Sequence, residues 1–287
     1  MRLRKVPGPA ALRPAPDARV VEAELSQEHR VVLLHGQPGS VEDWVGVAAA
    51  LPAGITSYAL DRPGYGDNVL AAGGFEHNAR AVLAEMDRQG IERTIVCGHS
   101  YGGGVAVAMA RLAPERVSSL LLVSSVAPDG LNGWDWVLAA PVLGWVCAVA
   151  AFLVTPPVVR AGLRRIERRR GSPLLGHEHV YWHAWGHSRH DHGRIWRTFL
   201  AEQRLLRGEL EELRRSLDGI TTPTVVLADR ADTIMPLWTA ERLAAAIPNA
   251  ALVIEEGGAG HHLPRRNPRA VATEIVALAS RSEQPVG

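Results

Sequence analysis

The chain has 287 residues, 47% of them hydrophobic, and its 31 basic and 30 acidic side chains leave a formal net charge of +1. This length suits one large α/β domain with an insertion, or two small domains, and the hydrophobic content argues against a disordered chain. The balanced charge gives no general attraction for nucleic acid. The two cysteines, Cys97 and Cys147, form neither a disulfide framework nor a metal-binding Cys-x-x-Cys pair, so a reducing cytoplasm is the expected compartment.

The N-terminus begins MRLRK, and no apolar segment follows it. Residues 7–18 are rich in proline and alanine and are expected to form a loose lead-in to the fold. Because a secretory signal needs an apolar segment at this place, we expect no such signal here.

Short apolar segments then alternate with segments of helical length. The apolar segments are expected to be strands, at residues 30–35, 55–60, 94–97, 117–126, 224–228 and 251–254, with a further edge strand at 19–25. The other segments are expected to be helices, at residues 40–51, 76–90, 101–113, 237–247 and 267–281. Strands that alternate with helices and are apolar throughout predict a mostly parallel sheet buried on both faces. The expected fold class is therefore α/β.

This alternation breaks between residues 130 and 218, where no strand pattern is recognisable. The region contains, in order, an apolar stretch at 142–155, a basic run at 160–170, a histidine-rich stretch at 176–193 and a charged helix at about 194–217. We expect a helical cap at 130–218, inserted into an α/β core that comprises residues 1–129 and 219–287.

The motif Gly98-His99-Ser100-Tyr101-Gly102 stands between an expected strand and an expected helix. In that position G-x-S-x-G forms a tight strand-to-helix turn that exposes the serine hydroxyl, and the turn needs small residues at both ends. The helix N-terminus also stabilises an anion beside it. The motif indicates a nucleophilic Ser100, and the alternative is a glycine-rich turn whose serine only caps the helix.

A second loop, with the sequence HGQPGS, follows the strand expected at 30–35. Acyl transfer needs hydrogen-bond donors aimed at the developing oxyanion. In enzymes with this serine turn, one donor is the N–H after the nucleophile and the other comes from the loop after an early strand. The sequence predicts that the backbone N–H groups of Tyr101 and Gln37 are these donors, and the alternative is an ordinary Pro-Gly turn.

An acid and a base follow later in the chain. Asp232 lies just past the strand expected at 224–228 and is preferred to Asp229, which is placed to end that strand or to pair with Arg230. His261 follows a glycine in the loop after the last expected strand and is preferred to His262. The order Ser, Asp, His along the chain is that of the serine-elbow enzymes, and the alternative is a pair of surface histidines.

Over residues 30–282 the chain resembles the α/β-hydrolase superfamily, through the segments HGQPGS, DRPGYG, GHSYGG, ADRADTIMP and GHHLPRRNP. The resemblance implies Ser100 as nucleophile, Asp232 as acid and His261 as base. It also implies that the insertion is a helical cap and that DRPGYG shapes a turn near the active site. Because the nucleophile is serine and not aspartate, the dehalogenase and epoxide-hydrolase branches are disfavoured.

The implied mechanism is acyl transfer through the enzyme. His261 accepts the proton of Ser100 as the serine attacks a carbonyl, while Asp232 orients the imidazole and stabilises its charged form. The N–H groups of Tyr101 and Gln37 bind the oxyanion, and water then hydrolyses the acyl-enzyme. No metal or organic cofactor is required.

The stretch at 142–155 contains no charged residue, so a helix there would be apolar on every side. Such a helix is expected to be buried or in contact with lipid. Flanking prolines leave it short for a membrane span, and a span would separate Ser100 from His261. We expect a cap helix whose Trp145 and Phe152, together with Trp182 further along, contact an apolar substrate. The alternative is a peripheral contact with a membrane surface, aided by the arginines at 160–170.

The histidine-rich stretch at 176–193 has a metal site as its alternative interpretation. His179, His183 and His187 are spaced to share one helical face, as zinc or nickel ligands would be. No cysteine joins them, so we expect a cap segment that lines or covers the pocket rather than a metal site.

The leading prediction of function is a serine hydrolase that cleaves an ester of a small-to-medium apolar substrate. The same triad also performs C–C bond hydrolysis, aminopeptidase-type amide hydrolysis and cofactor-free perhydrolysis, and sequence motifs do not separate these reactions. A ligand-binding protein without turnover is the third alternative, against which the intact triad argues. The expected partner is a small apolar molecule, and the sequence does not indicate the oligomeric state.

Overall fold

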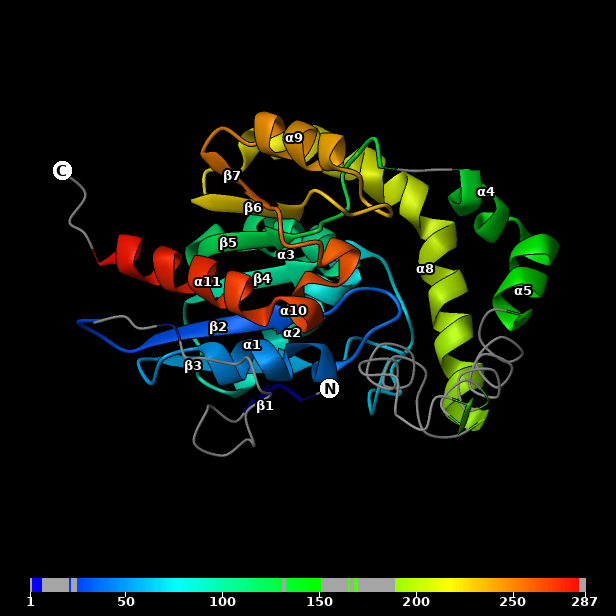
Figure 1. Ribbon diagram of the computed structural model, residues 1–287, viewed down its shortest axis with the longest axis horizontal. Coiled ribbons are helices and arrows are strands. Elements are labelled where there is room, and N and C mark those ends of the chain that lie inside the picture. Colours follow the sequence, from blue (N-terminus) through cyan, green and yellow to red (C-terminus); the bar gives the residue numbers. More distant parts are fainter. Residues whose placement is uncertain are drawn as a thin grey trace.

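In the computed structural model, a seven-stranded sheet forms the centre of the molecule (Figure 1). The structure describes residues 2–6, 21, 25–130, 133–150, 165, 168–169 and 189–283. In sequence order the strands are β1 (Arg4–Lys5), β2 (His29–Leu34), β3 (Ile55–Leu60), β4 (Thr94–His99), β5 (Val117–Val123), β6 (Thr224–Asp229) and β7 (Ala250–Glu255). Across the sheet the order is β1-β3-β2-β4-β5-β6-β7, and only the pair of β1 and β3 is antiparallel. The predicted α/β class with a mostly parallel sheet is confirmed.

Two apolar layers enclose this sheet, because successive side chains of a strand point to opposite faces. In β5, Leu120 and Leu122 pack on one face, and Leu121 and Val123 on the other. The first face is covered by α2 (Phe75–Arg88), α3 (Tyr101–Leu112) and α9 (Leu237–Ala246). The second is covered by α1 (Val45–Ala50), α10 (Leu263–Arg266) and α11 (Pro268–Ser282). Burial on both faces explains why the central strands are apolar throughout.

Two expected strands differ from the structure. The edge strand beside β3 is β1, which is only two residues long and lies between the buried side chains of Leu3 and Val6. Of the strand expected at 19–25, Val21 and Leu25 are described and are not in a strand, while the rest of it and the lead-in at 7–18 lie outside the described residues. The strand expected at 117–126 ends at Val123, because Ser124 turns the chain with a φ of 43°.

Of the residues described between β5 and β6, most belong to three helices: α4 (Gly133–Ala139), α5 (Pro141–Val149) and α8 (Arg189–Ser216). The long helix α8 runs along one edge of the core, and α4 and α5 lie on its far side from the sheet (Figure 1). The apolar side chains Leu206, Leu210 and Leu213 of α8 join the core on the α2–α3 face. Within the described residues, no helix is both long enough and apolar enough to cross a membrane.

Candidate active site

The turn from β4 into α3 places Ser100 in a strained backbone conformation. Ser100 has φ 52° and ψ −119°, a region that non-glycine residues adopt almost only where the surroundings impose it. A Cβ on Gly98 would lie 2.3 Å from the carbonyl oxygen of Gly102, and a Cβ on Gly102 would lie 2.3 Å from that of Leu34. Both positions therefore need glycine, and the serine side chain projects from the end of β4, as a nucleophile elbow requires.

A chain of hydrogen bonds connects Ser100 to His261 and Asp232. The Nε2 atom of His261 lies 3.1 Å from the Oγ atom of Ser100, and its Nδ1 atom lies 2.9 Å from Oδ2 of Asp232. These residues follow β4, β7 and β6 respectively, and the carboxyl ends of parallel strands meet at one edge of the sheet. The structure thus brings together the three residues that the sequence singled out as nucleophile, base and acid.

The environment of Asp232 favours its charged form. Its Oδ1 atom accepts hydrogen bonds from the backbone N–H groups of Ile234, at 2.9 Å, and Met235, at 2.8 Å. Burial alone would raise the pKa of this carboxyl, but the hydrogen bond and charge of His261 and these two N–H groups outweigh burial, and the pKa is lowered. A charged Asp232 accepts the Nδ1 proton of His261, which leaves Nε2 as the acceptor for the Ser100 hydroxyl.

The competing residues Asp229 and His262 have other contacts. Asp229 is fully buried and accepts the N–H groups of Ala231, at 2.8 Å, and Ala259, at 2.9 Å. It therefore connects the loop of Asp232 to the loop of His261, and Arg230 instead pairs with Glu256. Burial and the charge of His261 lower the pKa of His262 to about 4.

The loop that contains Gln37 lies beside Ser100. A Cβ on Gly36 would lie 3.0 Å from Cβ of Ser100 and 3.1 Å from Nδ1 of His99. Tyr101 is the first residue of α3, so its N–H has no acceptor within the helix. The structure thus places the loop of one predicted oxyanion donor and the N–H of the other next to Ser100.

An arginine that sequence reasoning missed lies behind this loop. Arg62, from the DRPGYG segment, is fully buried and donates hydrogen bonds to the carbonyl oxygens of His35 and Gly36, both at 2.9 Å. Its guanidinium also forms an ion pair with Glu202 of α8, which is equally buried. The DRPGYG segment was the only signal for Arg62, and nothing in the sequence marked Glu202 as its partner.

His99, next to the serine, supports the loop of His261. Its Nε2 atom lies 2.7 Å from the backbone carbonyl oxygen of His261, so Nε2 carries the proton and donates. Burial, and secondarily the charge of His261, lower the pKa of His99 to about 3. His99 is therefore neutral in the folded protein and fixes the backbone from which the His261 side chain projects.

This neutral histidine predicts a pH dependence of stability. In the unfolded chain a histidine takes up a proton below a pH of about 6.5, whereas folded His99 does not, so its contribution to stability is lost as the pH falls below that value. Between about pH 7 and pH 5.5 the loss is roughly 1 kcal/mol. The variant His99→Gln keeps a donor for His261 and is expected to lose correspondingly less stability over this interval, measured by urea unfolding at both pH values. Equal losses in the two proteins would show that folded His99 does take up the proton.

The residues predicted to contact substrate are only partly described. Trp145, on α5, is half-exposed, and its ring packs edge-on against Trp196 of α8 at 6.0 Å between centroids. Phe152, Trp182 and the histidines at 179, 183 and 187 lie outside the described residues. In the part of the chain that the structure describes, no group of three or more His, Cys, Asp or Glu side chains is placed to bind a metal ion.

A mostly parallel sheet with a serine elbow after a central strand, and with an aspartate and a histidine after later strands, defines an α/β-hydrolase fold with a nucleophile-elbow site. The alpha/beta hydrolase family model matches residues 31–274. The chain therefore belongs to the α/β-hydrolase family.

Several known proteins are similar to this chain. A pimeloyl-acyl-carrier-protein methyl ester esterase of Aromatoleum aromaticum is 27% identical over 237 residues, which cover 77% of this chain and 87% of that protein. The dihydrolipoyllysine-residue acetyltransferase component of the acetoin cleaving system of Pseudomonas putida is 38% identical over 106 residues, or 36% of this chain. That match spans only 29% of the acetyltransferase component. The structure of a thermophilic esterase from Thermogutta terrifontis superimposes with a TM-score of 0.69 at 20% identity, covering 91% of this chain and 92% of the esterase.

Proposed function

We propose that this protein is a serine hydrolase that cleaves an ester of a small-to-medium apolar substrate through an acyl-enzyme. The observation that carries the proposal is the hydrogen-bonded chain from Ser100 through His261 to Asp232, with the serine at a strained elbow. A ligand-binding protein would not need a serine in this conformation with a buried carboxylate behind its histidine.

In the proposed reaction, the Ser100 oxygen attacks the ester carbonyl carbon as His261 Nε2 accepts the serine proton. The carbonyl π electrons move to the oxygen, and the backbone N–H groups of Tyr101 and Gln37 donate to the resulting oxyanion. When the intermediate collapses, His261 passes the proton to the leaving alcohol. Water, deprotonated by His261, then attacks the acyl-enzyme in the same way and releases the acid.

The choice of an ester rests on the chemistry of this site and on relatives of the chain. An esterase is among the relatives that match most of its length. In this proposal, residues 130–218, which include the helices between β5 and β6, form a cap over the substrate pocket. Residues 1–129 and 219–287 form the core. Amide, C–C bond and perhydrolase substrates use the same triad, so a substrate panel has to include them.

The proposal is tested by a fluorophosphonate probe and a panel of p-nitrophenyl esters. We expect one probe molecule per chain, attached to the peptide that contains Ser100, and hydrolysis of the esters that stops as labelling proceeds. Peptide mass spectrometry locates the label. An unlabelled protein, or a label on another serine, would refute the assignment of the nucleophile.

The aromatic side chains of the cap are proposed to select apolar substrates. Each further CH₂ buried against Trp145, Phe152 or Trp182 would contribute roughly 0.8 kcal/mol, so kcat/KM is expected to rise about tenfold for two added carbons. Trp145→Ser should flatten this dependence and leave the rate on p-nitrophenyl acetate unchanged. If acetate and longer esters lose activity in equal proportion, Trp145 does not select substrate.

Peripheral contact with a membrane surface is the alternative role that we propose for α5. On α5, Val142, Leu143, Trp145 and Val146 are exposed, and the described arginines Arg165, Arg168 and Arg169 are exposed as well. Co-sedimentation with anionic vesicles that weakens as salt is added would support this contact, and the absence of binding at low salt would exclude it.

A further inference from the structure

The peptide unit between Gly36 and Gln37 connects Arg62 to the proposed oxyanion hole. A trans peptide unit is planar, with the carbonyl oxygen of one residue and the N–H of the next pointing in opposite directions. The carbonyl oxygen of Gly36 accepts a hydrogen bond from Nη2 of Arg62, at 2.9 Å. Fixing this oxygen therefore fixes the direction of the Gln37 N–H at the other side of the same unit.

A second side chain fixes the same oxygen. The Nδ1 atom of His35 lies 2.8 Å from the carbonyl oxygen of Gly36, and its Nε2 atom accepts the backbone N–H of Arg62, at 2.9 Å. Burial, followed by the charge of Arg62, lowers the pKa of His35 well below its usual value, so its ring is neutral with the proton on Nδ1. The Gly36 carbonyl thus accepts two hydrogen bonds, one of them from a cation.

A cation at the carbonyl also affects the opposite end of the peptide unit. Hydrogen bonds in a chain polarise one another, and a charged donor on the oxygen makes the N–H of the same unit a stronger donor. The charge of Arg62 is therefore transmitted through the Gly36–Gln37 unit toward the place where the oxyanion would form.

The position of Arg62 depends in turn on α8. Arg62 and Glu202 have side chains that are 0% exposed, and Glu202 also accepts the hydroxyl of Tyr65, at 2.6 Å. The rings of Tyr65 and Tyr101 lie 4.8 and 4.6 Å from the guanidinium carbon. Without the Glu202 carboxylate, the guanidinium would be a buried cation without a counter-charge, and it would move toward other acceptors or water.

We propose that Arg62 and Glu202 are positioning residues of the oxyanion hole, which connect the seating of α8 to the direction and strength of the Gln37 N–H donor. Both side chains are fully buried, so neither is placed to touch a substrate. The proposal rests on the proposed function, because it concerns the oxyanion of that reaction.

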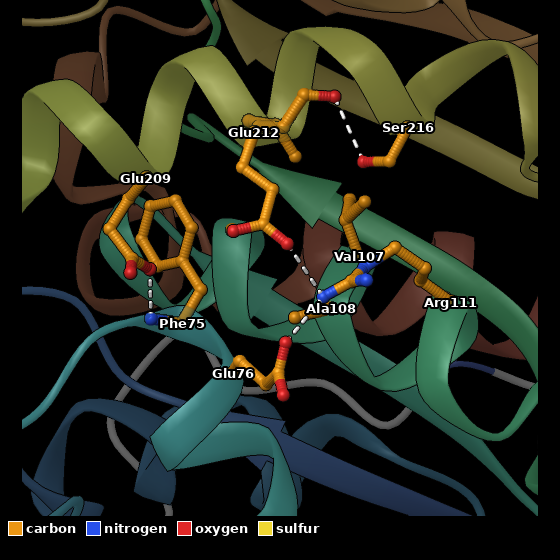
Figure 2. A pocket seen from close by; sticks show the side chains of 10 residues that line it. Phe75, Glu76, Val107, Ala108, Arg111, Glu209, Glu212 and Ser216 are labelled. Carbon is orange, nitrogen blue, oxygen red and sulfur yellow. Dashed lines mark hydrogen bonds and ion pairs between the residues drawn. The ribbon is translucent and has the colours of Figure 1, made fainter.

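The chain offers a matched control on the same helix. Glu209 lies seven residues, two helical turns, after Glu202 and also faces the core. Figure 2 shows its carboxylate directed at the backbone nitrogen of Phe75, the first residue of α2. The neighbouring Glu212 pairs with Arg111, at 3.0 Å, in the same view. Glu209 therefore attaches α8 to the core as Glu202 does, but it has no contact with the loop of Gln37.

The test compares Arg62→Lys, Glu202→Gln and Glu209→Gln with the parent protein in ester hydrolysis, with active sites counted by fluorophosphonate titration. A second readout is the inhibition constant of an octyl trifluoromethyl ketone. Its carbonyl carbon bonds to the Ser100 oxygen, the serine proton passes to His261, and the carbonyl oxygen becomes the oxyanion. A transition-state analogue of this kind reports oxyanion binding directly.

Loss of one oxyanion donor typically lowers kcat by on the order of 10²–10³, so a misdirected donor in Arg62→Lys is expected to lower it by about 10- to 100-fold. Glu202→Gln should lower kcat by about tenfold for the same reason. In both variants the inhibition constant of the ketone should rise by the factor by which kcat/KM falls, with KM little changed. Glu209→Gln should lower the melting temperature and leave kcat per active site and the inhibition constant unchanged.

A purely structural role for the pair predicts a different result. Arg62→Lys and Glu202→Gln would then resemble Glu209→Gln, with less folded protein but an unchanged kcat and inhibition constant per titrated site, and this would overturn the proposal. If neither variant folds, Tyr65→Phe, which removes one hydrogen bond from Glu202, decides between the positioning role and the structural role. The readouts are again kcat per active site and the inhibition constant of the ketone. A parent protein that hydrolyses no ester and binds no fluorophosphonate would refute the proposed function instead.

Discussion

Replacing Ser100 by alanine is expected to lower kcat for ester hydrolysis by on the order of 10⁵-fold or more, because it removes the oxygen that attacks the substrate in the proposed reaction. His261→Ala should cost nearly as much, since an unactivated serine hydroxyl is a weak nucleophile. The double variant with Ser100→Ala and His261→Ala should be no slower than Ser100→Ala alone, because triad residues act as a unit and their effects do not add. Stopped assays at high enzyme concentration, with the background rate subtracted, measure these residual rates.

Asp232→Asn completes the series, with an expected loss of on the order of 10³-fold or more. The asparagine amide would turn a donor toward Nδ1 of His261, so the imidazole would reverse its tautomer and Nε2 would no longer accept the serine proton. Since the Ser100 oxygen and the oxyanion donors remain, this variant should still bind substrate with a similar KM.

Two neighbouring residues are the matched controls for the triad. His262→Ala should leave most of kcat, because the His262 ring packs on His261, 5.7 Å between centroids, and has no described bond to Ser100 or Asp232. Asp229→Asn should cost far less in kcat than Asp232→Asn, but it should lower the free energy of unfolding by about 2 kcal/mol, since one of two buried N–H groups loses its acceptor. A larger loss of kcat in either control than in its partner would reverse the assignment of acid or base.

The sequence predicts most of the sheet because its central strands are buried on both faces and so are apolar without interruption. The edge strand β1 could not be predicted in the same way. With two residues in β1, no alternation is visible, and the edge strand was expected at residues 19–25 instead. Pairing at an edge is decided by the partner strand, here β3, more than by the local composition.

The residues of the site likewise divide into those that the local sequence predicts and those that only the packing reveals. Ser100, Asp232 and His261 were predictable because each stands in a short motif directly after an apolar strand, where parallel strands bring distant loops together. The pair of Arg62 and Glu202 was not predictable, since its members are 140 positions apart and each looks like an ordinary surface charge. Only the packing of α8 against the loop after β3 shows that both are buried and paired with each other.

The structure also shows how closely α3 approaches β2 at the serine motif of residues 98–102. The sequence indicated small residues at both ends of the serine turn, and the structure shows what each would meet. The nearest atoms to a Cβ on Gly102 belong to the backbone of Leu34 and His35, just before the loop that contains Gln37. Glycine at this position therefore sets the distance between the serine elbow and the loop that contains Gln37.

Gly102→Ala is accordingly expected to lower the free energy of unfolding by about 3 kcal/mol, the upper range for overpacking, because backbone atoms at 2.3 and 2.7 Å cannot rotate away from the new methyl group. The first turn of α3 would shift away from β2, and kcat should fall with it, since the Tyr101 and Gln37 N–H groups lie on the two sides of this contact. Gly208→Ala on α8 is the matched control, because a Cβ there meets nothing within 4 Å. Its expected effect has the opposite sign, a gain of about 1 kcal/mol from helix propensity, with kcat unchanged. Urea unfolding of both variants measures the two changes, and a Gly102→Ala variant as stable as the parent would show that the contact with β2 does not require glycine.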